Sequence, residues 1–208
     1  MGPPQDHPSS MDPAPGPTTP APSPQTVVQG EGFAGWQALN DTIMGGRSSG
    51  LCTVGPGGLR FDGEVVEEGG GFISMRSPLF SPPLDLSRAR GLEWVLWGEG
   101  RRFKVAIACA DGVAGLTELI PGGLRWVKEF DTAPEGFTRV ALPFAELIPS
   151  VRARPLEGLP LGLPLRFDPA RITRLQLLHS RFGDDGGPNG GFRPGPIHVE
   201  IQAIHVLA

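Results

Sequence analysis

The sequence predicts an all-β protein, an antiparallel sandwich or barrel that follows a disordered, proline-rich tail. Its 208 residues include 31 Gly and 24 Pro, roughly twice their ordinary usage. Both residues are unfavourable inside helices, so a helical bundle is excluded. Apolar residues instead recur with a period of two, as in strands, and Gly/Pro clusters separate these segments. A hydrophobic fraction of 39% allows a substantial core, and the length suits one domain.

The N-terminal part differs in composition from the rest. Residues 1–24 contain nine Pro, interspersed with Ser, Thr and Ala, which is typical of a disordered, partly polyproline segment. We predict a disordered tail over residues 1–26 and one folded domain over residues 27–208. The tail lacks the features of a secretory or transit peptide, and no run approaches the ~18 apolar residues of a membrane span. These observations predict a cytoplasmic protein with no membrane insertion.

Eight segments have the period-two pattern of strands, and turn clusters such as Gly55–Gly58 and Pro121–Gly123 separate them. At most a single helical turn is expected, at Phe144–Ile148. Two connections, Ala145–Arg171 and Arg181–Pro196, are unusually long, and loops of such length often border binding sites. The predicted strands are Leu59–Val65, Gly71–Ser77, Gly91–Trp97, Arg102–Ala110, Leu124–Asp131, Thr138–Phe144, Ile172–Ser180 and Ile197–Val206.

Motifs for catalysis are weak. Gly46–Gly50 fits the G-x-S-x-G pattern of hydrolases, but a nucleophile elbow needs a helix after the serine, and no helix pattern follows. Gly98–Phe103 begins like a dinucleotide loop but lacks the third glycine. Calcium held by Asp184 and Asp185, beside glycines, is an alternative for the last long loop. We predict no catalytic residues, no metal and no cofactor.

Charge argues against nucleic-acid binding. The formal net charge is −4, and a near-neutral domain has no general electrostatic attraction to a phosphate backbone.

Alternation along the strands assigns side chains to faces. Phe103, Val105 and Ile107 share one face, which we expect to be the core, and Lys104 lies on the other. By the same rule Arg76 shares a face with Ser74. A face that mixes polar and aromatic residues is either a solvated outer surface or a binding surface.

We predict a binding face that carries Arg76, Lys104, Trp126 and Gln176, with a compact turn over Asn40–Ser48 at its edge. Gly45 and Gly46 give that turn its conformational freedom, and Asn40 and Asp41 are expected to accept hydrogen bonds from nearby backbone amides. Asp41 is a candidate charge partner for Arg47 or Arg76. The full set of predicted partner- or ligand-binding residues is Trp36, Asn40, Asp41, Arg47, Arg76, Lys104, Trp126 and Gln176.

Five segments in order resemble the NADH:ubiquinone oxidoreductase complex I intermediate-associated protein 30 family. Each motif alone is modest, but together they cover about residues 33–208. They are Trp36 with Asn40–Ser48, the GGGFISMR run Gly69–Arg76, the GEGRRFK run Gly98–Lys104, the segment Trp126–Phe144 ending in VALPF, and the closing Pro194–Ile204.

The resemblance implies a galactose-binding-like jelly roll, a β-sandwich shared with carbohydrate-binding modules. It also implies a non-catalytic assembly factor or chaperone for a membrane-associated respiratory or photosynthetic complex, here in a bacterial setting. The partners would be protein subunits of that complex. Carbohydrate binding by the jelly roll is the alternative function, and the fold alone does not decide between the two.

Overall fold

The computed structural model describes residues 2, 25–110, 123–152, 154–156 and 165–208. Within these ranges it contains strands and short 3₁₀ turns and no α-helix. The turns are η1 (Gly30–Phe33), η2 (Asp41–Met44), η3 (Phe144–Glu146) and η5 (Pro169–Arg171). The strands are β1 (Thr26–Gln29), β2 (Gln37–Ala38), β3 (Ser49–Gly55), β4 (Gly58–Val65), β5 (Phe72–Arg76), β6 (Gly91–Trp97), β7 (Arg102–Cys109), β8 (Arg125–Asp131), β9 (Thr138–Pro143), β10 (Ile148–Val151), β11 (Arg154–Pro155), β12 (Ile172–Ser180) and β13 (Gly195–Leu207).

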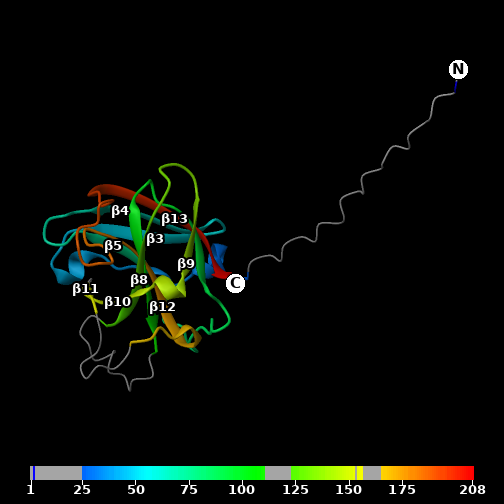
Figure 1. Cartoon of the computed structure of the whole chain (residues 1–208). Coiled ribbons are helices and arrows are strands. Elements are labelled where there is room, and N and C mark those ends of the chain that lie inside the picture. Colours follow the sequence, from blue (N-terminus) through cyan, green and yellow to red (C-terminus); the bar gives the residue numbers. More distant parts are fainter. Residues whose placement is uncertain (1, 3–24, 111–122, 153, 157–164) are drawn as a thin grey trace.

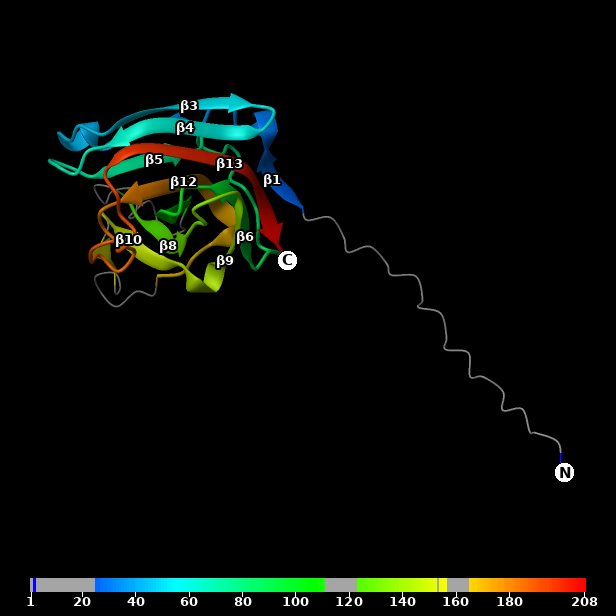
Figure 2. The same ribbon diagram turned by 90° about the horizontal axis from the view of Figure 1, so that it is seen from above.

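The strands form two antiparallel sheets that pack face to face, which confirms the predicted sandwich (Figure 1). One sheet has the order β3-β4-β13-β6-β9, with β1 beside β13. The other has the order β11-β10-β8-β7-β12-β5-β2. Figure 2 shows β3, β4 and β13 side by side in one layer, and places the start of β1 next to the C-terminus.

The core lies between the sheets and follows the predicted alternation. Phe103, Val105 and Ile107 of β7 are buried and belong to the core cluster, as predicted. Trp94 of β6, in the other sheet, is also fully buried and belongs to the same core cluster. A large apolar side chain contributes about 1.5–3 kcal/mol when it is fully buried, so residues of this kind carry most of the stability.

Eight strands lie where the sequence predicts them, within a residue or two, and β6 and β12 match residue for residue. Five strands were not predicted: β1, β2, β3, β10 and β11. Two of these, β10 and β11, lie inside the predicted long connection Ala145–Arg171. Their prolines, Pro149 and Pro155, argued against strands there, yet proline is tolerated toward the edge of a sheet, which is where β10 and β11 pair.

The predicted tail, residues 1–26, falls almost entirely outside the described residues. The strand β1 begins at Thr26, one residue before the predicted boundary at residue 27. Among the described residues no helix is long and apolar enough to cross a membrane.

Candidate functional site

The turn after β2 is built around a buried carboxylate. Asp41 has no exposed surface, and its two oxygens accept four hydrogen bonds. Ser48 gives two of them, from N (2.8 Å) and Oγ (2.7 Å), and the backbone N–H groups of Gly71 (2.7 Å) and Phe72 (3.3 Å) give the others. Burial would raise the pKa of Asp41, but the hydrogen bonds outweigh it, and the pKa lies below its usual value.

Glycines make room for this carboxylate. A Cβ at Gly46 would lie 2.3 Å from the Asp41 Cγ, and a Cβ at Gly70 would lie 2.3 Å from Oδ2. Gly45, at φ 88°, takes the left-handed conformation at the end of η2. The predicted compact turn is therefore confirmed. Its glycines fit a function that the sequence did not reveal, which is the close approach of the backbone to Asp41.

The prediction that Arg47 or Arg76 is the charge partner of Asp41 is wrong. Arg47 pairs instead with Glu68 at the surface, and Asp41 is satisfied by Ser48 and two amides. The side chain of Asn40 also differs from expectation, because its Oδ1 is buried and accepts no hydrogen bond from the described residues. Ser48 was missed as a partner. The G-x-S pattern drew attention to it only as a nucleophile, whereas its Oγ is buried and accepts the N–H of Val66 (2.9 Å).

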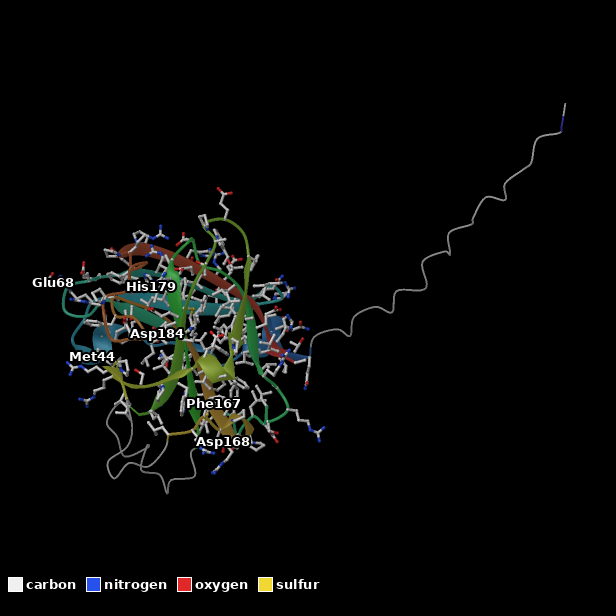
Figure 3. The ribbon with its side chains drawn as sticks, in the orientation of Figure 1. Met44, Glu68, Phe167, Asp168, His179 and Asp184 are labelled. Carbon is white, nitrogen blue, oxygen red and sulfur yellow. The ribbon has the colours of Figure 1, made fainter. Side chains whose placement is uncertain are left out.

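Both predicted tryptophans lie in the core. Trp36 is 6% exposed and packs edge-to-face on Phe33 and Trp94. Trp126 is 7% exposed and packs edge-to-face on Phe167, which is labelled in Figure 3. Trp126 pairs in register with Ile107, so it belongs to the inner face of the seven-stranded sheet. The prediction that it shares a face with Arg76 and Lys104 is therefore wrong.

Lys104 does lie on the outer face, but a loop covers it. The Nζ group donates to the carbonyl oxygens of Phe182 and Gly183, both at 2.9 Å. Burial lowers the pKa of Lys104, and the carboxylates of Glu129, Asp184 and Asp185 act against this shift. The loop Arg181–Pro196 thus borders the face, as its length suggested.

The Lys104 ammonium interacts electrostatically with Asp184 and Asp185, the two residues of the calcium alternative. It already engages two backbone carbonyls, which are the oxygen ligands that Ca²⁺ prefers. Among the described residues, no group of three or more His, Cys, Asp or Glu side chains could hold a metal ion.

His179, which Figure 3 labels, is buried on the core side of β12, where it lies in register with Ile73, and it fastens the same loop. Its Nδ1 donates to the Arg102 carbonyl (2.9 Å), and its Nε2 accepts the Arg193 N–H (3.3 Å). The ring stacks on Phe192. Burial, with the nearby charges of Arg101 and Arg193, lowers the pKa of His179 to about 4, despite the opposing effect of the Arg102 carbonyl.

The rest of the outer face keeps two of the predicted residues together. Arg76 of β5 lies opposite Gln176 of β12 in the register. The Gln176 Nε2 donates to Ser74 Oγ (2.9 Å), and that hydroxyl donates to the Leu39 carbonyl (2.5 Å), next to the Asp41 turn. The face and the turn are therefore joined by one chain of hydrogen bonds. Arg125 and Arg174, which the prediction did not include, lie on this face as well.

Comparisons with known proteins agree with this architecture. The family model of complex I intermediate-associated protein 30 matches residues 26–201. A comparison with curated protein sequences found no match.

Two solved structures of family 11 carbohydrate-binding modules from Clostridium thermocellum have the same fold. One, in complex with a β-1,3-1,4-mixed-linked tetrasaccharide, is 16% identical at a TM-score of 0.53, covering 88% of this chain and 95% of the module. The other, from a cellulosomal cellulase, is 16% identical at a TM-score of 0.54, covering 90% and 96%. At this identity the likeness shows the fold alone, a galactose-binding-like jelly roll, as predicted.

Proposed function

Because the chain belongs to the complex I intermediate-associated protein 30 family, we propose that it is a non-catalytic binding module that assists assembly of a membrane-associated respiratory or photosynthetic complex. Complex I is the first candidate. The observation that carries this proposal is the family match over residues 26–201, almost the whole described domain. We propose that the protein acts from the cytoplasm and binds protein subunits of that complex.

The buried polar residues support a role without catalysis. Ser48 and Asp41 bond to each other and to backbone amides. His179 and Lys104 hold the loop 181–196 through backbone atoms. A nucleophile or general base has to reach a substrate, whereas these four side chains direct their hydrogen bonds into the protein.

Carbohydrate binding is the competing hypothesis, because the family 11 modules share the fold. A shared fold does not transfer a ligand. Sugars are usually bound on exposed aromatic rings, and both tryptophans that we expected on the binding face, Trp36 and Trp126, lie in the core. This placement favours a protein partner over a sugar.

The test is disruption of the gene in the organism of origin. On native gels, we expect the disrupted strain to lose assembled complex I and to accumulate smaller subassemblies. The wild-type chain, supplied in trans, should restore the complete complex. A second assay measures sedimentation of the purified protein with mixed-linked β-glucan. Normal assembly of complex I and of any photosynthetic complex in the disrupted strain would contradict the proposal, and tight binding to the glucan would favour the sugar hypothesis.

A further inference from the structure

Three arginines from three strands gather at one end of the outer face of the seven-stranded sheet. Arg174 of β12 lies opposite Ala108 of β7. In the neighbouring strand β8, Trp126 lies opposite Ile107 of β7. Arg125, the residue before Trp126, therefore lies beside Ala108, on the edge of β7 that faces away from β12. Arg76 of β5 lies opposite Gln176, two residues from Arg174 on the same face. We call these three residues the arginine face.

All three side chains point away from the core. Each is flanked by a buried core residue, and alternation puts the arginine on the opposite side. The flanking residues are Met75, Trp126 and Leu175. Each arginine is partly exposed. Between Arg174 and Arg125, the strand β7 carries the small side chains of Ala106 and Ala108 on its outer side.

Among the residues that the structure describes, no carboxylate pairs with these positive charges. Other arginines and lysines of the sheets do form ion pairs, as in Arg102 with Asp131, Arg139 with Glu93 and Lys128 with Glu146. No described Asp or Glu forms an ion pair with a member of the arginine face. Arg174 donates to the Ser77 carbonyl (3.1 Å), and Arg125 donates to the carbonyl of its neighbour Leu124 (2.8 Å).

The three arginines also act on one another. Burial lowers the pKa of Arg125, and the positive charges of Arg174 and Arg76 lower it further. Burial and Arg76 do the same for Arg174. A protein of net charge −4 therefore maintains a local cluster of repelling positive charges. Such a cluster is relieved when an anion binds.

Guanidinium groups suit carboxylates, which they bind through two parallel hydrogen bonds. On an extended peptide, side chains at i and i+2 share one side and lie about 7 Å apart. Arg76 lies opposite Gln176, which is two residues from Arg174 along β12. Arg76 and Arg174 are therefore spaced along the sheet as two alternate side chains of an extended peptide are. The exposed amide of Gln37 lies beside Arg76 in the register and adds a further donor.

We propose that the arginine face binds a short acidic segment of a partner protein, with alternate Asp or Glu carboxylates held by Arg76, Arg125 and Arg174. The proposal rests on the proposed function, for which it names the chemistry of the partner. A long polyanion such as nucleic acid would meet the negative charge of the rest of the domain, whereas a short acidic segment meets only the cluster. A uronic-acid polysaccharide is the rival that the experiment has to separate.

The experiment measures fluorescence anisotropy of a labelled peptide of alternating Glu and Ala, titrated with the full chain at about 0.05 M salt, where screening is weak. The matched control peptide has Gln in place of Glu. We expect the Glu peptide to bind at least about tenfold more tightly than the Gln peptide, because guanidinium groups form stronger hydrogen bonds to a carboxylate than to a neutral amide. The affinity should fall as salt is raised.

Variants assign the binding to these residues. Arg76→Gln and Arg174→Gln should each lower the affinity for the Glu peptide by about tenfold. Arg139→Gln, on the other sheet, should leave this affinity unchanged. Circular dichroism melts establish that each variant is folded. Equal binding of the two peptides, or binding that survives both arginine substitutions, would overturn the proposal. Tighter binding of polygalacturonate than of the Glu peptide would overturn the choice of a protein partner.

The two proposals fail separately. Arginine-dependent peptide binding in a protein whose gene is dispensable for complex assembly would remove the assembly role and leave the anion site. The disrupted strain could instead lose complex I and be fully restored by the Arg76→Gln, Arg174→Gln double variant. That result would show that assembly does not depend on the anion site.

Discussion

The Asp41 turn and the arginine face are both charged and adjoin the same strand, β5, yet they differ in how their charges are satisfied. Asp41 is buried and receives four hydrogen bonds from within the chain. The guanidinium groups of Arg76 and Arg174 have no carboxylate among the described residues. A charge whose partners are internal stabilises the fold, whereas a charge without a partner is available to a ligand.

The largest effect is expected when the partners of the buried carboxylate are disturbed. Asp41→Asn keeps the size of the side chain but replaces one acceptor oxygen with an amide donor that faces N–H and O–H donors. We expect the free energy of unfolding to fall by about 4 kcal/mol, since hydrogen bonds to a charged group contribute ~1.5–3 kcal/mol each. Urea denaturation measures this loss.

Glycine variants give the matched control. Gly46→Ala places a methyl group against the Asp41 carboxylate, and we expect a loss of about 2–3 kcal/mol. Gly55→Ala introduces the same methyl group where no atom lies within 4 Å, and it should leave stability nearly unchanged. If Asp41→Asn and Gly46→Ala were as harmless as Gly55→Ala, the turn would not depend on the carboxylate.

His179 extends the comparison to a buried group that titrates. Its pKa is about 4 in the folded protein and near 6.5 when unfolded, so only the unfolded state takes up a proton between these values. The free energy of unfolding should therefore fall as the pH is lowered from about 6.5 to about 4, by up to roughly 3 kcal/mol. Below pH 4 this group adds no further loss.

The measurement compares urea denaturation of the wild type and His179→Phe across this range. The Phe variant keeps the aromatic stacking and cannot take up a proton. It should lack the His179 part of the pH dependence, although the loss of two hydrogen bonds lowers its stability at pH 7. Identical slopes for the two proteins would show that His179 is not held neutral.

Much of the fold could be predicted from alternation alone. The strands β6, β7 and β12 have strong alternating apolar patterns, and their inner residues, such as Val105 and Leu175, form the core. The short strands β2 and β11 contain two residues each, too few for a period to appear. They exist because neighbouring strands offer free backbone groups.

The site was harder to predict. Alternation shows which residues of a strand share a face, but it does not show which of the two faces packs on the core. Trp126 was predicted on the binding face with Lys104, whereas it pairs in register with Ile107, which belongs to the core. Ser48 and Asp41 are seven residues apart in the chain, and Gly71 is thirty residues from Asp41. Contacts at such a separation leave no periodic signal. Arg76 and Gln176 were correctly brought together because both lie in strong strands.

The smallest effect is expected where a charge has no internal partner, and a pair of arginines tests this directly. The guanidinium of Arg76 has no hydrogen bond to another described residue. Arg76→Gln should therefore change the free energy of unfolding by no more than about 0.5 kcal/mol, with relief of the repulsion from Arg125 and Arg174 opposing any loss of packing. Arg101 is 6% exposed and donates to the carbonyls of Arg193 and Pro196, so Arg101→Gln should cost about 2–3 kcal/mol by leaving buried acceptors unpaired. Urea denaturation of the two variants makes the comparison. An Arg76→Gln loss as large as that of Arg101→Gln would mean that Arg76 stabilises the fold, and the arginine face would no longer be a set of charges available to a partner.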